Sequence, residues 1–368
     1  MPRPATIEEL CEIVAAGGKL RLRGGGSKDA IGAPTPGATV IDMRGFTGVI
    51  DYDPPELVLT VGAGTPLADV QALVAGEGQM LAFDPFDHGA MLGGAARSAT
   101  MGGVIAAGVA GPARLSRGGA RDHLLGFTAV SGRGERFVAG AKVVKNVTGY
   151  DLPKVVTGSW GRLVALTELT LKVLPRPAMR RTLVMRGLDA ASAVDALAAA
   201  MGTAAEVSAA AHLPDWRDGP VTAVRFDGFP KSVAARAAML TGFEAVDDAA
   251  GDALWDAVRY AALLPVDRPL WRLVVAPSRA PDVVATLPDA DWLFDWAGGL
   301  IWLASEADPA VVRAAAVAAG GHAMLFRADE DVRAAGPALH PQPPALAALE
   351  ERVRRAFDPD GVFETGRF

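Results

Sequence analysis

The chain has 368 residues, of which half are hydrophobic and 21% are charged; this is a globular composition, long enough for two or three domains. Its 36 Lys and Arg residues against 42 Asp and Glu residues give a net charge of −6, which excludes a bulk electrostatic attraction to nucleic acid or anionic lipid. Cys11 is the sole cysteine, so an internal disulfide, a cysteine-based zinc site and a cysteine-ligated iron–sulfur cluster are excluded. With no apolar signal core and no apolar run that could span a membrane, we expect a cytoplasmic protein.

The first elements of the chain lead into a glycine-rich loop. Thr6 and Glu9 have the spacing of a capping box, which predicts a helix from Ile7 that ends at Gly17-Gly18. Residues 19–23 alternate polar and apolar side chains, the pattern of a half-buried strand, and run directly into glycines 24–26. Further patterns predict strands over 38–43, 57–61 and 164–173, a helix over 65–76, a hairpin over 127–138, and an irregular loop with one short helix over 89–119.

Glycine and tryptophan divide the chain into two parts. Residues 1–177 hold 29 of the 42 glycines, whereas six of the seven tryptophans follow residue 177. The later part predicts alternating elements, which indicate a compact α+β domain. These are helices over 190–201, 309–319 and 345–357, and strands over 183–185, 221–226, 270–275 and 299–303. The tryptophans fit either a core or an interface with a partner protein.

The glycine loop is the first candidate binding motif. Consecutive glycines let several backbone N–H groups converge on one anion. Ser27 adds a hydroxyl, and Arg21, Arg23 and Lys28 add positive charge, a combination that suits a diphosphate. The loop matches neither G-x-G-x-x-G nor a P-loop, and a flexible surface turn is the alternative.

Two further segments are unusual for this sequence. Residues 92–119 are rich in glycine and alanine, which would allow a planar ligand to lie against the backbone or two helices to pack closely. Residues 145–152 contain Asn146, the sole asparagine, beside Lys145, Thr148, Tyr150 and Asp151; this is either a binding segment or a polar turn. The five histidines show no metal-ligand spacing, and no G-x-S-x-G motif occurs. We therefore predict no metal site and leave the catalytic residues unassigned.

Together these segments form an ordered set of motifs. A strand ends in R-G-G-G-S, followed by T-M-G-G-V-I-A-A-G-V-A-G-P at 100–112, R-G-G-A-R-D-H-L-L-G at 117–126, K-N-V-T-G-Y-D-L at 145–152 and G-S-W-G-R-L-V-A-L-T-E-L-T-L-K-V-L-P at 158–175. The set resembles the FAD-binding domain of the vanillyl-alcohol-oxidase / p-cresol-methylhydroxylase (PCMH-type) family. Within that family it is similar to the small FAD-binding subunits of bacterial glycolate oxidases. F-D-P-D-G-V-F at 357–363 extends the resemblance to the last part of the chain.

The resemblance implies an α+β fold, with a PCMH-type two-subdomain FAD-binding domain over 1–177 and a smaller α+β cap over 178–335. A linker, helix and tail over 336–368 would return to the FAD domain. The implied cofactor is non-covalent FAD, since the loop holds no histidine for covalent attachment. The cofactor-binding residues implied are Arg23, Gly24, Gly25, Gly26, Ser27, Lys28, Thr100, Gly102, Gly103, Ala107, Gly111, Arg117, Asp122, Tyr150, Gly158, Gly161 and Val164.

Two departures from the family pattern shape the expected function. The cap lacks the H-x-G-D-G-N-x-H-type motif of the catalytic subunits, and Glu364-Thr365-Gly366 stands where Asn-Pro-Gly is expected. The resemblance then implies the FAD-binding subunit of a complex that oxidises glycolate to glyoxylate. It would act in electron transfer or as a flavin-bearing scaffold, beside a larger FAD-binding subunit and an iron–sulfur subunit. The complex could also associate peripherally with the inner face of a membrane. A self-sufficient FAD-dependent 2-hydroxy-acid or alcohol dehydrogenase and a non-catalytic assembly subunit remain alternatives.

Overall fold

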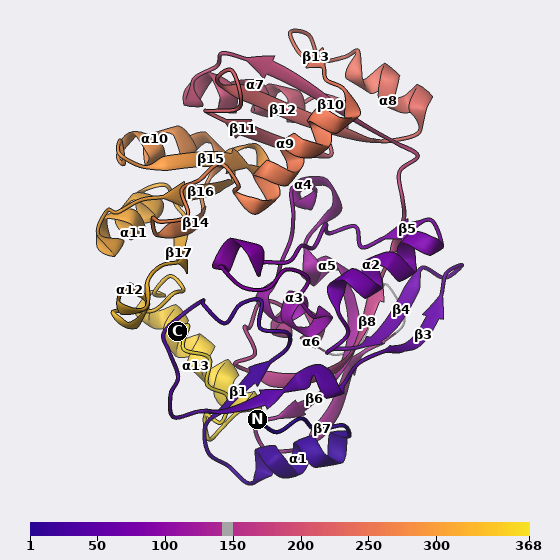
Figure 1. Cartoon of the computed structure of the whole chain (residues 1–368), viewed down its shortest axis with the longest axis vertical. Helices are drawn as coiled ribbons and strands as arrows, with labels where there is room; N and C mark the ends of the chain where they lie inside the picture. The colour runs from indigo at the N-terminus through magenta and orange to yellow at the C-terminus, as the bar shows by residue number, and fades with distance from the viewer. Residues whose placement is uncertain (142–149) are drawn as a thin grey trace. The chain divides into compact units, whose positions relative to one another are not determined.

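The computed structural model describes residues 1–141 and 150–368, which pack as two compact units. Unit 1 comprises Met1–Gly111, Gly118–Arg176 and Pro341–Phe368, and unit 2 comprises Pro112–Arg117 and Pro177–His340. The α+β fold class is confirmed, since both units combine helices with sheets (Figure 1). Among the described residues, no helix combines the length and the apolar character that crossing a bilayer requires.

Unit 1 contains a parallel strand pair and an antiparallel sheet. The parallel pair is β1 (Leu20–Arg23) with β2 (Thr39–Asp42), and the sheet has the order β3-β4-β8-β6-β7. The other strands are β3 (Val49–Asp53), β4 (Val58–Gly62), β5 (Gln79–Met80), β6 (Leu124–Ser131), β7 (Arg136–Gly140), β8 (Val164–Lys172) and β9 (Leu174–Pro175). The helices are α1 (Ile7–Ala15), α2 (Leu67–Gly76), α3 (Met101–Ala107), α5 (Ala120–His123), α6 (Leu152–Val156) and α13 (Pro344–Phe357), with 3-10 turns η1 (Met43–Gly45) and η2 (Ala90–Leu92).

The predicted elements of unit 1 are mostly confirmed. The capping box holds α1 at Thr6 and Glu9, and Leu10 and Val14 of this helix pack into a core with Leu20 of β1. The segment 89–119, predicted as an irregular loop with one short helix, contains the short helix α3 and in addition α4 (Arg114–Arg117) and the 3-10 turn η2. Thr100 begins α3 by accepting a hydrogen bond from the Gly103 amide, a capping signal that the abundance of glycine masks.

Unit 2 is built on one antiparallel sheet of eight strands, in the order β13-β10-β12-β11-β15-β16-β14-β17. The strands are β10 (Met179–Arg186), β11 (Ala209–Leu213), β12 (Val221–Gly228), β13 (Glu244–Ala245), β14 (Leu270–Val274), β15 (Asp291–Asp295), β16 (Leu300–Ala304) and β17 (His322–Arg327). The helices are α4, α7 (Ala190–Met201), α8 (Pro230–Ala237), α9 (Asp248–Tyr260), α10 (Ala280–Ala285), α11 (Pro309–Ala318) and α12 (Glu330–Ala334), with η3 (Pro277–Arg279) and η4 (Trp296–Gly298).

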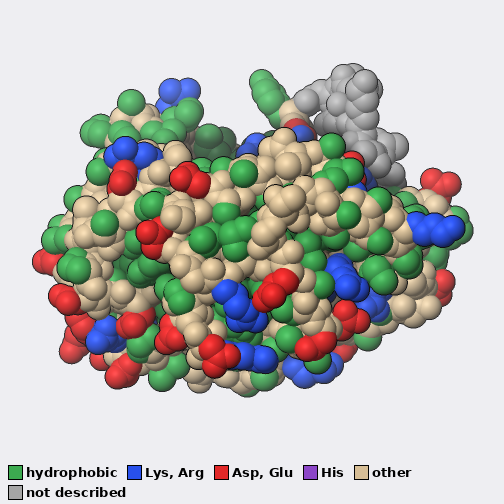
Figure 2. Space-filling model, turned by 90° about the horizontal axis from the view of Figure 1, so that it is seen from above, with side chains coloured by type: hydrophobic (Ala, Val, Ile, Leu, Met, Phe, Trp, Pro, Cys, Tyr) green, Lys and Arg blue, Asp and Glu red, His purple; other side chains and the backbone are tan. Residues whose placement is uncertain are grey.

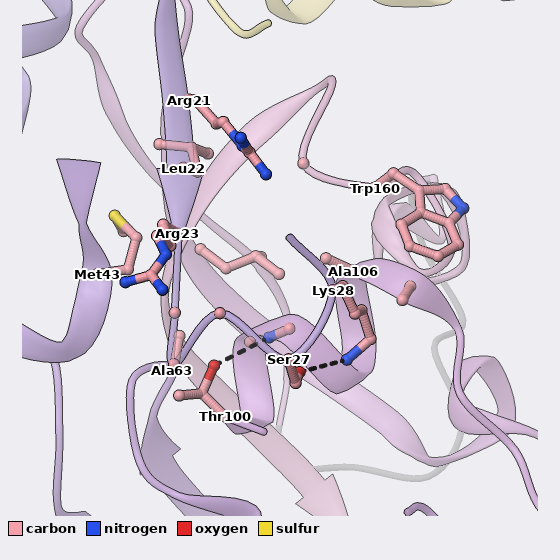
Figure 3. A pocket seen from close by; sticks show the side chains of 18 of the residues that line it. Arg21, Leu22, Arg23, Ser27, Lys28, Met43, Ala63, Thr100, Ala106 and Trp160 are labelled. Atoms are coloured by element: carbon pink, nitrogen blue, oxygen red, sulfur yellow. Dashed lines mark hydrogen bonds between the residues drawn. The ribbon is translucent and has the colours of Figure 1, made fainter. Parts of the chain in front are cut away.

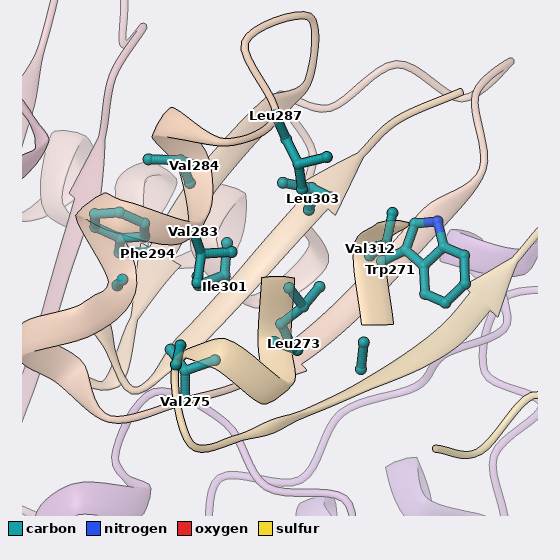
Figure 4. Packing of buried hydrophobic residues seen from close by; sticks show 14 of the residues in the cluster. Trp271, Leu273, Val275, Val283, Val284, Leu287, Phe294, Ile301, Leu303 and Val312 are labelled. Atoms are coloured by element: carbon teal, nitrogen blue, oxygen red, sulfur yellow. The ribbon is translucent and has the colours of Figure 1, made fainter. Parts of the chain in front are cut away.

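The tryptophans of unit 2 serve mainly as core residues. Trp271 and Leu273 of β14 pack with Ile301 of β16 against Val283 of α10 and Val312 of α11 (Figure 4). Trp255, Trp296 and Trp302 are also at most 3% exposed, which favours the core interpretation for most of the six. On the face shown in Figure 2, acidic and basic side chains are interspersed, without the block of basic charge that nucleic-acid binding needs.

Candidate cofactor site

The glycine loop lies at the end of β1 and forms one wall of a cleft in unit 1. Its close approach to the segment before α3 explains why glycine is required: a Cβ on Gly25 would lie 1.8 Å from the Ser98 carbonyl oxygen, and one on Gly24 would lie 2.2 Å from Thr100 Oγ1. Within the described part of the chain, the N–H groups of residues 24–28 donate to no protein acceptor. Consecutive free amides beside a cleft form a binding surface for an anion.

The side chains around this loop carry excess positive charge. Arg21 and Arg23 pair with Asp29 at 3.3 and 2.6 Å, and Lys28 Nζ donates to Ser27 Oγ at 3.2 Å (Figure 3). Across residues 1–141 and 150–368, Lys28 has no ion pair, although its side chain is buried. Burial lowers the pKa of Lys28 to about 8, an effect that the nearby Asp87 carboxylate opposes.

Arg367 adds another buried cation from the far end of the sequence. Its Nη2 donates to the Lys28 carbonyl at 3.0 Å and its Nη1 to the Thr365 carbonyl at 3.1 Å, while its Nε is buried without a partner in the described structure. Burial is the main cause that lowers the pKa of Arg367 to about 10, and Arg21 contributes by repulsion. The cleft is thus lined by four cationic side chains and by the Asp29 carboxylate, in a chain whose net charge is negative.

The remaining walls are small or apolar. Gly102, Gly103, Ala106 and Ala107 of α3 form one side. A Cβ on Gly103 would make ordinary contacts, 3.4 Å from Thr100 Oγ1 and 3.9 Å from Lys28 Nζ. Trp160 lies beside α3 because its amide donates to the Ala106 carbonyl at 2.7 Å. Apolar wall residues come from several strands and turns: Leu22, Met43, Ala63, Val164 and Leu166.

The polarity of the cleft suits an elongated dinucleotide, with charged and apolar walls side by side. A cationic end with free amides suits a diphosphate, and the apolar walls suit planar rings. The residues present therefore satisfy the chemistry that FAD requires.

Most of the predicted cofactor-binding residues line this cleft. They are Arg23, Gly24, Gly25, Gly26, Ser27, Lys28, Thr100, Gly102, Gly103, Ala107, Gly161 and Val164. Arg21, indicated by the sequence as positive charge beside the loop, also lines the cleft. The structure adds lining residues that were not predicted to bind the cofactor: Leu22, Asp29, Met43, Ala63, Ala106, Trp160, Leu166 and Arg367.

Five of the predicted residues do not line the cleft, and three of them make other contacts within unit 1. Gly111 is packed so closely on Asp84 that a Cβ would lie 2.4 Å from its carbonyl oxygen. Asp122 accepts a hydrogen bond from the Gly119 amide at the start of α5, and Gly158 donates to the Ile105 carbonyl. Arg117 belongs to unit 2, and Tyr150 is 90% exposed.

The polar cluster over 145–152 is tested only in part. Lys145, Asn146 and Thr148 lie outside the described residues, whereas Asp151 pairs with Lys154 at 2.7 Å. Within the described ranges, no group of three or more His, Cys, Asp or Glu side chains is placed to hold a metal ion.

Comparison with known proteins identifies the family. Residues 2–140 match the model of an FAD binding domain. The chain is 34% identical over 367 residues to glycolate oxidase subunit GlcE of Escherichia coli (strain K12), covering 99% of this chain and 96% of that protein. It is 30% identical over 196 residues to glycolate oxidase subunit GlcD of Bacillus subtilis (strain 168), covering 51% of this chain and 40% of that protein.

Solved structures show the same fold at low sequence identity. An alkyldihydroxyacetonephosphate synthase aligns with a TM-score of 0.68 at 14% identity, over 99% of this chain and 76% of that one. A 6-hydroxy-D-nicotine oxidase from Arthrobacter nicotinovorans aligns with a TM-score of 0.65 at 16% identity, over 99% and 90%. The near full-length match to GlcE, the FAD domain match and the cleft agree, and the predicted FAD cofactor is confirmed. The chain belongs to the family of FAD-dependent oxidoreductases that includes glycolate oxidase subunit GlcE.

Proposed function

We propose that this chain is an FAD-binding subunit of a glycolate oxidase complex. The observation that carries the proposal is the cationic cleft with its free loop amides, in a chain that matches a named glycolate oxidase subunit over nearly its whole length. In this proposal unit 1 holds FAD and unit 2 serves as the cap domain. Bound FAD supplies the capacity to accept and pass on the electrons removed from a hydroxy acid.

The residues of the cleft have separate roles in holding the cofactor. Lys28, Arg367 and the amides of the glycine loop would hold the diphosphate. The small residues on α3 would allow close approach of the flat parts of the dinucleotide, and Leu22, Met43 and Val164 would exclude water beside them. The Asp29 carboxylate would keep Arg21 and Arg23 oriented through its ion pairs.

We place the oxidation of glycolate on a partner subunit. Removal of the hydroxyl proton needs a base whose pKa is near the working pH. His212 of unit 2 is 1% exposed, bonded through Nδ1 to Thr222 Oγ1 at 2.9 Å, and burial lowers its pKa to about 4. These properties make it a core residue, so a GlcD-type flavin subunit would supply the base. An iron–sulfur subunit would carry the electrons onward, because this chain has one cysteine.

The test compares the purified chain with the chain co-expressed with its partner subunits. Alone, the chain should bind FAD and turn over glycolate negligibly with an artificial electron acceptor; in the complex, glycolate oxidation should appear. Robust turnover of glycolate or another 2-hydroxy acid by the isolated chain would instead support a self-sufficient dehydrogenase. A chain that folds but cannot be reconstituted with FAD would support an assembly subunit.

A further inference from the structure

The segment 358–367 follows α13 and is held along unit 1 by backbone hydrogen bonds. The Leu20 amide donates to the Val362 carbonyl and the Glu364 amide donates to the Leu20 carbonyl, both at 2.8 Å. Lys19 Nζ donates to the Gly361 carbonyl at 2.6 Å. The segment therefore lies beside the first residue of β1, the strand that leads into the glycine loop.

Beyond β1, the segment is attached to residues that follow the glycine loop. The Ala33 amide donates to the Gly366 carbonyl at 2.6 Å, and Arg367 reaches the Lys28 carbonyl. Glu364 fixes the turn between these contacts, because its Oε1 accepts from the Thr365 and Gly366 amides at 2.9 and 3.0 Å. The Glu364-Thr365 departure from the family pattern thus forms an internally bonded turn that delivers Arg367 into the cleft.

The guanidinium of Arg367 retains binding capacity in that position. Of its five N–H donors, one on Nη1 and one on Nη2 bond to the two backbone carbonyls, and the buried Nε has no partner among the described residues. Its Cζ lies 5.2 Å from the ring centre of Trp160, which also lines the cleft. Neither carbonyl nor indole neutralises a full positive charge, and a buried cation without a counter-ion is costly.

We propose that Arg367 completes the dinucleotide site from the end of the 358–367 segment, by binding the diphosphate of FAD together with Lys28. The segment then couples the region after α13 to cofactor retention: the diphosphate supplies a direct ion-pair partner, which neither of these two adjacent buried cations has among the described residues. A role confined to fastening the segment would need the two carbonyl contacts alone and would leave the buried Nε without a partner in the described structure. The proposal depends on FAD binding and is independent of whether glycolate is the substrate.

The experiment measures binding to the isolated apo chain, without substrate or partner. FAD and ADP, which shares the diphosphate and lacks the flavin, are titrated into the wild type, Arg367→Gln and Arg367→Lys over a range of salt concentrations. Arg355→Gln is the matched control, because Arg355 is 69% exposed and bonds to Glu351 on α13. Apo thermal unfolding is recorded for each variant, so that a loss of packing is detected separately.

Because Arg367→Gln removes a charge-assisted hydrogen bond, we expect it to weaken the binding of FAD and of ADP by a similar factor, roughly ten to one hundred at low salt. The difference from wild type should shrink as salt screens the diphosphate. Arg367→Lys should recover part of the affinity, and Arg355→Gln should bind like wild type. If Arg367→Gln bound FAD and ADP with the same affinity and the same salt dependence as wild type, the proposal would be overturned. An affinity loss of the same size at every salt concentration, accompanied by a lower apo melting temperature, would also overturn it in favour of a fastening role.

Discussion

Replacing Lys28 by methionine should strengthen the fold of the apo protein and weaken the binding of FAD. The ammonium group is buried and has one hydrogen-bond partner among the described residues, Ser27 Oγ, so the fold holds a charge that water would solvate better. Lowering its pKa from the ordinary 10.5 to about 8 corresponds to a cost of about 3 kcal/mol for the protonated form at neutral pH. Methionine has similar length and carries no charge.

The sign of the pH dependence follows from the same shift. A lysine whose pKa is lowered by folding destabilises the folded state most below about pH 8, where both states are protonated. The penalty disappears as the pH rises from the folded pKa toward the unfolded pKa. The stability difference between Lys28→Met and wild-type apo protein should therefore be largest near neutral pH and shrink in alkaline solution. Urea unfolding of the apo forms measures this difference directly.

FAD binding should show the opposite response, because the protonated Lys28 is the form that attracts the diphosphate. Wild-type affinity should be steady at neutral pH and fall above about pH 8, by up to about tenfold for each pH unit. Lys28→Met should bind FAD more weakly and lack this decline. Lys172→Met, at the last residue of β8 and outside the cleft lining, is the matched control. A Lys28→Met protein with lower apo stability, or with unchanged FAD affinity, would refute the reasoning.

Four further substitutions test the site and the two units. A Cβ at Gly103 fits 3.4 Å from Thr100 Oγ1, so Gly103→Asp adds a carboxylate to the cleft and should lower the amount of flavin bound per folded chain. Gly25→Ala should lower the yield of folded protein, because its Cβ would collide with the Ser98 carbonyl. Hydrogen bonds from Arg354 and Arg355 lower the pKa of Glu351 to about 2. Wild type should therefore be more stable than Glu351→Gln in urea unfolding near neutral pH, and this difference should vanish as the pH falls from about 4.5 to 2. Trp271→Ala should destabilise unit 2 by about 3–5 kcal/mol through a cavity in its core, and an unchanged thermal transition would contradict that packing.

Sequence patterns are sufficient to predict the helices and strands whose formation depends on neighbouring residues alone. The capping box at Thr6 predicts α1 and is present; likewise the alternation over 19–23 predicts β1. β11 was missed because Ala209–Leu213 begins with three alanines, which have low strand propensity. All five residues are buried, and pairing with β12 and β15 holds them extended. β3 was missed because its first residues, Val49 and Ile50, are about half exposed and show no alternation.

The residues of the candidate site likewise fall into those predicted from neighbouring residues and those joined only by the fold. The loop at 24–28 was predicted from neighbouring residues, whereas Arg367 joins it across 339 positions of sequence. No periodicity or spacing links residues so far apart, and only the motif at 357–363 indicated that the end of the chain returns to this domain. Tyr150 is 90% exposed and does not line the cleft, because a cluster of polar residue types predicts hydrogen bonding but not where the side chain points.

The glycines of the loop have a second cause that the sequence does not reveal. The sequence predicts that they let backbone N–H groups converge on an anion, and the structure shows in addition that a Cβ at Gly25 would collide with the protein's own Ser98 carbonyl. The glycines let the loop press against residues 98–100, and in that position its amides have no protein acceptors within the part of the chain that the structure describes. An acidic substitution at Gly25 would therefore combine electrostatic repulsion with misfolding. Gly103 separates the two effects, since a side chain fits there and Lys28 Nζ lies 3.9 Å from the added Cβ.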